Sequence, residues 1–189
     1  MKTEKDIINL IKNDEYMMKI LETAETLDID DYWICAGFIR NKVWDVLHNY
    51  SNRTPYNDID FVYFDSENLS KSNEKDIEHQ LYKKQSDVIW EVVNQARMYD
   101  NHPDVLADCA SDGIANFPET PTSVGIRLKN SKLVMTTPHG IEDLINGIVS
   151  PTPLFRHKNY IDIYRNRINI KSWQTLWPNL TINKEESHD

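Results

Sequence analysis

The segment Asn57-Asp58-Ile59-Asp60-Phe61-Val62-Tyr63-Phe64 places two carboxylates at the head of an apolar run rich in β-branched and aromatic residues. Such a run predicts a buried strand over residues 58–64. Because side chains alternate between the two faces of a strand, Asp58 and Asp60 fall on the same face. Two ionised carboxylates on an apolar strand repel each other, and a hard divalent cation such as Mg²⁺ can neutralise both through oxygen ligands. The pair therefore predicts a metal site. The alternative is that both acids cap the strand entrance and face water.

A second strand is expected upstream of this pair, and it ends at a glycine. Residues 32–36 are short and apolar, Gly37 closes them, and residues 38–50 show helical periodicity. The free amides at such a helix start, together with the helix dipole, form a natural seat for phosphate, to which Arg40 could add a bidentate fork. Alternatively, Gly37 is an ordinary turn glycine and Arg40 a surface residue. The sequence contains no Walker-type glycine loop.

A third acid, Glu91, lies in the apolar run 87–93, which predicts a further strand. By alternation Glu91 shares its face with apolar neighbours, so a carboxylate is expected within an apolar strand. If this strand lies beside the Asp58–Asp60 strand, the three acids form a set that can hold two divalent cations. The alternative is an acid at a strand edge, paired with Arg97 or a lysine.

The remaining patterns indicate the fold class. Three strands that alternate with helices predict an α/β (α+β) protein, and a later hairpin makes its sheet mixed, with helices flanking it. The hairpin is expected from the extended runs 122–128 and 132–136, separated by Lys129-Asn130-Ser131. Helices are also expected to begin near Thr3 and near Asn13 or Asp14, and to span residues 67–85, 110–116, 141–149 and 155–176.

Length and charge limit the domain organisation and the partners. A chain of 189 residues suits one domain, so we expect a single domain over 1–182 and a flexible polar tail over 183–189. The net charge of −9 disfavours general binding to duplex nucleic acid or tRNA. Residues 121–171, however, carry eight Lys and Arg against three Asp and Glu. This basic region could hold a polyphosphate beside a metal site, or it could be a solvated helix face.

The cysteines and the hydropathy pattern bear on the compartment. Cys35 and Cys109 fit no zinc or redox spacing, and no apolar run approaches the ~20 residues that a membrane span needs. We therefore expect reduced thiols and a soluble, cytoplasmic protein with no membrane partner.

Taken together, the strand–glycine–helix, the Asp-hydrophobic-Asp strand and the acid on a third strand resemble the nucleotidyltransferase superfamily, which includes DNA polymerase beta and the aminoglycoside nucleotidyltransferases. Four segments in order are similar to a bacterial branch of nucleotidyltransferase-like proteins of about this length, and the resemblance extends over roughly residues 15–180. They are AGFIRNKVWD (36–45), NDIDFVYFD (57–65), WEVVNQARM (90–98) and PHGIEDL (138–144).

This resemblance implies a minimal nucleotidyltransferase fold. It also implies transfer of a nucleoside monophosphate from an NTP to an acceptor hydroxyl, with Mg²⁺ or alternatively Mn²⁺. By position, the catalytic and metal-binding residues are Asp58, Asp60 and Glu91, and the third acid orients or deprotonates the acceptor. The nucleotide-binding residues implied are Gly37, Phe38, Arg40 and Asn41.

The sequence departs from the superfamily pattern at three points. Phe38 follows Gly37 where Gly or Ser is usual, the gap from Gly37 to Asp58 is longer, and the third acid is Glu instead of the commoner Asp. The leading hypothesis is a nucleotidyltransferase with an unknown acceptor, a small molecule or a protein in preference to long nucleic acid. The alternative is a catalytically inactive nucleotide-binding or regulatory module with the same fold, which Phe38 favours. A third hypothesis is a protein-modifying or antitoxin-like partner protein.

Most other residues with reactive or stacking side chains are expected to have structural roles. His139 is expected to be a satisfied surface histidine, and Trp173 and Trp177 are expected to be packing residues. Three polar residues after the third strand could line the acceptor side: Asn94, Gln95 and Arg97.

Overall fold

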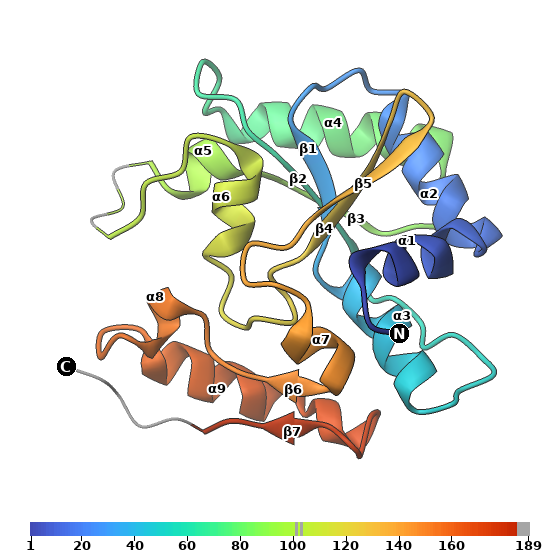
Figure 1. Cartoon of the computed structure of the whole chain (residues 1–189). Helices are drawn as coiled ribbons and strands as arrows, with labels where there is room; N and C mark the ends of the chain where they lie inside the picture. Colours follow the sequence, from blue (N-terminus) through green and yellow to red (C-terminus); the bar gives the residue numbers. More distant parts are fainter. Residues whose placement is uncertain (101, 103, 185–189) are drawn as a thin grey trace.

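The fold is built on a five-stranded mixed sheet with the strand order β3-β2-β1-β4-β5 (Figure 1). The computed structural model describes residues 1–100, 102 and 104–184. β1 pairs antiparallel with β2 and β4, β4 pairs antiparallel with β5, and β2 and β3 run parallel. The predicted mixed sheet flanked by helices is therefore confirmed. The five strands are β1 (Tyr32–Cys35), β2 (Ile59–Tyr63), β3 (Trp90–Asn94), β4 (Gly125–Lys129) and β5 (Lys132–Thr136).

Helices precede the sheet and fill the connections between its strands (Figure 1). α1 begins with a capping box in which Thr3 and Asp6 bond each other's backbone N–H groups, and Asp14 caps α2. The helices are α1 (Glu4–Lys12), α2 (Glu15–Glu25), α3 (Gly37–Leu47), α4 (Lys71–Lys84), α5 (Gln95–Met98), α6 (Ala110–Ala115), α7 (Glu142–Asn146), α8 (Pro153–Arg156) and α9 (Ile161–Lys171).

The two faces of the sheet are covered unequally. One face carries the main hydrophobic core, in which Ile34 and Phe61 pack with apolar residues of α1 to α4. The other face carries a small cluster in which Trp33 and Val62 pack against α6. Because side chains alternate, Asp60 points to this second face while its neighbours in β2 point into the main core. The fold therefore directs the carboxylate to the less covered side.

Predicted and observed element bounds differ in two helices. The single helix predicted over 155–176 is wrong, because His157 is extended and the left-handed Ser172 ends α9. The chain then forms a 3₁₀ turn (Trp173–Thr175) that brings two tryptophans back to α3. The helix predicted over 141–149 stops early at Gly147, whose φ of 66° makes it a left-handed C-cap.

The C-terminal region forms a second, smaller layer below the sheet in Figure 1, with α7, α8, α9 and a two-stranded parallel sheet. That sheet joins β6 (Ile148–Val149) to β7 (Thr181–Ile182). Asn183 donates its backbone N–H to the Val149 carbonyl at 2.8 Å. Of the polar tail expected over 183–189, residues 185–189 lie outside the described residues. Within the described part of the chain, each helix is too short or too polar to cross a bilayer.

Candidate active site

Three carboxylates converge on the second face of the sheet. In the parallel β2–β3 pair, Asp60 lies directly opposite Glu91, and Asp58 lies just before β2. One carboxylate oxygen from each of the three residues lies within 4.8 Å of the others. Asp58 and Glu91 are exposed and Asp60 is half-buried. This arrangement matches the spacing that the sequence implies for three acids on adjacent strands.

The surroundings of Glu91 differ from the sequence expectation. Glu91 lies in an apolar strand, as predicted, but its side chain is exposed because it points to the less covered face of the sheet. β3 is an edge strand, as the alternative has it, but the pairing with Arg97 is wrong, since Arg97 donates to Glu74 at 2.8 Å. Within the described residues, no ion pair reaches Asp58, Asp60 or Glu91.

The electrostatics of the three carboxylates favour the binding of a cation. Burial, and next the neighbouring carboxylates Asp58 and Glu91, raise the pKa of Asp60 to about 7, while Arg40 and Arg167 oppose this rise. A carboxylate with so high a pKa is stabilised when a cation joins the cluster. Three oxygen donors without a bound side-chain cation are the ligand set that Mg²⁺ or Mn²⁺ prefers. The residues present therefore fit a divalent metal.

A helix start faces the carboxylates. Ala36 is the N-cap of α3, has φ 54° and ψ −120°, and offers no capping side chain. The amides of Gly37 and Phe38 precede the first intrahelical bonds, which start at Ile39 and Arg40. The unusual backbone angle lies at Ala36 and not at Gly37. A Cβ on Gly37 would stand 3.4 Å from Nη2 of Arg40, so the missing side chain leaves room at the helix start.

Two of the four residues implied to bind nucleotide, Phe38 and Arg40, have buried side chains. The Phe38 side chain is buried in the main core, so only its backbone can face a ligand. Arg40 is buried as well, which corrects the alternative of a surface arginine. It donates to Thr122 Oγ1 at 2.8 Å and to Asn41 Oδ1 at 3.0 Å, and its guanidinium lies 4.7 Å from the Trp173 ring. Burial lowers the pKa of Arg40 to about 10, so it stays charged at neutral pH.

A pocket of 290 Å³ joins this helix start to the carboxylates, and we call it the basic pocket. Its cations are Arg40, Arg167 and Lys171. In the sequence, Arg167 belongs to the basic region 121–171, and no local pattern connects it with the carboxylates. Its spacing of four residues from Lys171 on one helix was the available signal. Arg167 is held by Glu119, which is fully buried and accepts its Nε–H at 2.6 Å.

A second pocket of 450 Å³ meets the basic pocket at the carboxylates, and we call it the aromatic pocket. Both pockets are lined by Ala36, Asp60, Glu91 and Arg167. Beyond this shared edge the aromatic pocket is mainly apolar, with residues from β2, β3, α5, α8 and α9. Asp60 and Glu91 thus stand between a basic compartment and an apolar one, and Asp58 lies on the basic side.

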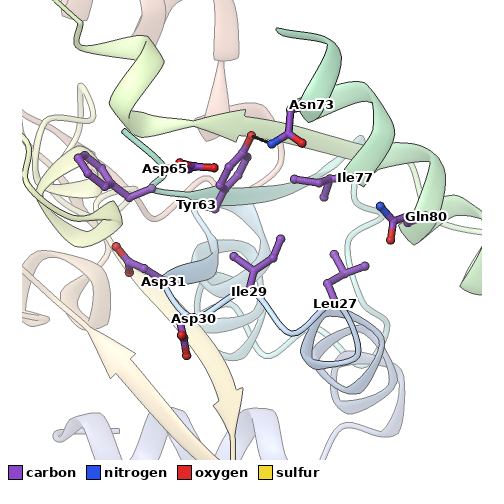
Figure 2. A pocket seen from close by; sticks show the side chains of 10 residues that line it. Leu27, Ile29, Asp30, Asp31, Tyr63, Asp65, Asn73, Ile77 and Gln80 are labelled. Atoms are coloured by element: carbon purple, nitrogen blue, oxygen red, sulfur yellow. Dashed lines mark hydrogen bonds between the residues drawn. The ribbon is translucent and has the colours of Figure 1, made fainter. Parts of the chain in front are cut away.

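A further hollow of 380 Å³ lies at the opposite end of β2 from Asp58, between that strand, α4 and the end of α2 (Figure 2). Figure 2 shows its acids Asp30, Asp31 and Asp65 spread around the rim instead of converging. Asp31 accepts the Ala110 N–H at 2.7 Å, and Asp65 accepts two N–H groups of the following turn. These roles are structural, so the three converging acids are the better candidate for a metal site.

The remaining candidates from the sequence lie at the edges of the site or outside it. His139 bonds the Ala115 carbonyl at 2.7 Å and lines neither pocket. Trp173 and Trp177 are buried against Trp44, with ring centroids at 5.6 and 5.2 Å, and also line the basic pocket. Three polar residues were candidates for the acceptor side: Asn94, the last residue of β3, caps α5, Arg97 pairs with Glu74, and Gln95 lines the aromatic pocket.

Comparison with known proteins agrees with this arrangement. A family model described as "Nucleotidyltransferase" matches residues 22–182. A protein whose NMR structure is described as revealing a CCA-adding enzyme head domain is 30% identical, with 97% of each chain covered and a TM-score of 0.84. No curated protein matches the sequence.

Two more distant structures share the fold. The Thermotoga maritima CCA-adding enzyme, complexed with tRNA, is 11% identical with a TM-score of 0.56, and the match covers 93% of this chain and 42% of that one. A tRNA-processing enzyme is 13% identical with a TM-score of 0.51, and the match covers 87% of this chain and 44% of that one.

Proposed function

The chain belongs to the nucleotidyltransferase family, and from this we propose that it transfers a nucleoside monophosphate from an NTP to an acceptor hydroxyl. The observation that carries the proposal is the convergence of Asp58, Asp60 and Glu91 within 4.8 Å beside a helix start without a capping side chain. Asp58, Asp60 and Glu91 would hold Mg²⁺, or Mn²⁺ in its place. When bound, the metal would neutralise the phosphates and the charge that develops during transfer.

Different residues of the protein would bind the phosphates of the nucleotide and activate the acceptor hydroxyl. The amides of Gly37 and Phe38, with Asn41, would bind the terminal phosphates at the N-terminus of α3. Arg40, Arg167 and Lys171 line the same pocket and would neutralise the leaving pyrophosphate. Glu91, the most exposed position of β3, would accept the proton of the attacking hydroxyl.

The acceptor is proposed to be a small molecule or a protein in preference to long nucleic acid. The structurally similar CCA-adding enzyme is complexed with tRNA, but the match covers only 42% of that chain. The present chain has a net charge of −9, and its net positive region, residues 121–171, contributes Arg167 and Lys171 to the basic pocket. This distribution suits a triphosphate better than an extended polyanion.

A decisive experiment uses α-labelled NTPs, Mg²⁺ and cell extract with the wild-type protein and the Asp58→Ala/Asp60→Ala variant. We expect a labelled product only with the wild type, since the variant lacks two of three metal ligands. Asp30→Ala is the matched control, because this acid is fully exposed and remote from the cluster, and it should keep full activity. Equal labelling by the wild type and the double variant would contradict the proposal.

The second candidate is a nucleotide-binding module without transfer activity. The buried side chain of Phe38, which replaces the usual small residue after the glycine, favours it. Mg²⁺-dependent NTP binding by calorimetry, together with no labelled product from any of the four NTPs, would select this candidate over the enzyme.

A further inference from the structure

The aromatic pocket has the size of a small-molecule site and one unusual wall. Its volume is 450 Å³, within the range of ~300–1,000 Å³ that is typical of such sites. Four aromatic rings that line it follow one another in contact: Tyr99 to His102 at 6.0 Å, His102 to Tyr160 at 5.9 Å, and Tyr160 to Phe155 at 6.0 Å. Tyr160 is fixed by a hydrogen bond from its hydroxyl to Asp104. The wall thus presents ordered rings to whatever occupies the pocket.

Charge is restricted to one end of this pocket. Its ionised residues, Asp60, Glu91 and Arg167, all lie on the edge shared with the basic pocket. Elsewhere the lining is uncharged and mainly apolar or aromatic, with the polar residues Gln95, Asn116 and Thr122 among them. Two of its apolar side chains, Met98 and Ile163, remain 57% and 52% exposed. A ligand that covered them would gain the free energy of removing apolar surface from water.

The positions of the two pockets indicate which part of the reaction each one would hold. Attack on the α-phosphorus proceeds in line, so the acceptor oxygen enters opposite the leaving pyrophosphate. The cations that suit pyrophosphate line the basic pocket on one side of the carboxylates, and the aromatic pocket opens on the other.

Resting on the proposed function, we infer that the aromatic pocket is the acceptor site, and that the acceptor is a small, largely uncharged molecule with a planar ring and a hydroxyl group. The ring stacks on the aromatic wall and the hydroxyl reaches Glu91. In the transfer step this oxygen gives its proton to the Glu91 carboxylate and forms the new bond to the α-phosphorus. The bond from that phosphorus to the bridging oxygen breaks, and pyrophosphate leaves with the electron pair.

The test uses two exposed isoleucines of the same helix. Ile163 lines the aromatic pocket, whereas Ile170, which is 71% exposed, lines neither pocket of the site. Binding of 2-phenylethanol and of glucose is followed by NMR shifts of backbone amides in the wild type, Ile163→Glu and Ile170→Glu. Each titration is repeated with Mg²⁺ and a non-hydrolysable ATP analogue.

We expect 2-phenylethanol to shift the amides around Val93 and Tyr160, and to bind at least about tenfold more tightly than glucose. Ile163→Glu should weaken this binding about tenfold, Ile170→Glu should not, and the ATP analogue should not displace the probe. Three results overturn the inference: no preference over glucose, shifts that survive Ile163→Glu, or displacement of the probe by the ATP analogue, which would make this pocket the nucleobase site. Failure of the proposed function is recognised separately, as absence of Mg²⁺-dependent binding of the ATP analogue.

Discussion

At the scale of a single residue, Asp60 has the burial and the neighbouring carboxylates that favour binding of a metal ion. It lies on a strand whose other face is core, and it stands next to two further carboxylates. Its pKa of about 7 lies above the usual value near 4 that it has in the unfolded chain. The folded protein therefore holds a proton at Asp60 between about pH 4 and pH 7 that the unfolded chain releases. Stability without metal should fall as pH rises through this window.

This pH dependence predicts how Asp60→Asn changes the stability of the protein. Without metal at pH 8, the variant should be more stable than the wild type by about 1–3 kcal/mol, because it removes the cost of ionising Asp60. At pH 4, where Asp60 is protonated in the folded wild type, the difference should vanish. Urea unfolding at both pH values measures this, with Asp30→Asn as the exposed control. Excess Mg²⁺ should then stabilise the wild type and not Asp60→Asn.

The ion pair of Glu119 with Arg167 shows how a buried acid orients a cation toward the site. Glu119 is fully buried, whereas Arg167 is partly exposed and lines both pockets. Oε2 of Glu119 has no hydrogen-bond partner, so Arg167 provides the main compensation for its charge. Removal of Arg167 takes away the only ion-pair partner that the described residues give this buried carboxylate, and leaves Arg40 as a more distant positive charge.

Arg167→Met should therefore destabilise the protein by about 3 kcal/mol. The double variant Arg167→Met/Glu119→Gln should recover more than half of this loss, because the buried charge is gone. Lys171→Met, one helical turn further, should change stability by less than about 0.5 kcal/mol. Chemical denaturation of the four proteins checks the series, and a double variant as unstable as the single one would contradict it.

At the scale of elements, the turn between β4 and β5 holds two non-glycine residues in a left-handed backbone conformation. Asn130 and Ser131 connect β4 to β5 with φ values of 52° and 60°, which is the pattern of a type I′ turn. Asparagine adopts a positive φ readily, and serine does so at a cost that glycine avoids.

Ser131→Gly should therefore raise the free energy of unfolding by about 0.5–1 kcal/mol without altering the site. Asn130→Val should act in the opposite direction, since a β-branched residue resists a positive φ. Thermal unfolding of both variants beside the wild type tests the pair. Destabilisation by Ser131→Gly would mean that its hydroxyl, and not its backbone angle, matters at this position.

The strands and the acid cluster could be predicted because their signals are local. The apolar alternation of 58–64 and the adjacent carboxylates define both a strand and the direction of Asp60. The burial of Arg40 against Trp173, and the pairing of Arg167 with Glu119, join residues about 50 to 130 positions apart. Such contacts depend on how α9 and the 3₁₀ turn pack, and the turn arises from a left-handed serine that no periodicity reveals.

At the scale of the whole molecule, the C-terminal layer is tied to the sheet layer through α3. Asp45 is buried and accepts hydrogen bonds from Trp177 Nε1 at 2.8 Å and from Thr54 Oγ1 at 2.7 Å. The Trp44 ring packs edge-on against Trp173 and Trp177. The tryptophan contacts connect α3 with a segment about 130 residues further along the chain, so the two layers should not unfold independently.

We accordingly expect a single unfolding transition, with far-UV circular dichroism and tryptophan fluorescence coinciding in urea. Trp177→Ala, at a position only 1% exposed, should lower stability by about 3–5 kcal/mol and keep one transition. Leu176→Ala is the neighbouring control, 51% exposed, and should have a small effect. Two separated transitions in the wild type would show that the layers are independent units.

The unequal covering of the sheet also bears on how this protein can change over evolutionary time. The carboxylates lie on or next to β2 and β3, whereas part of the aromatic pocket is formed by exposed side chains outside the main core, such as Met98 and Ile163. Substitutions at these two positions alter the shape of the aromatic pocket without disturbing the packing of the main core. With the acceptor site proposed above, selection for a new acceptor, natural or in the laboratory, would therefore proceed there by single substitutions that leave the three carboxylates unchanged.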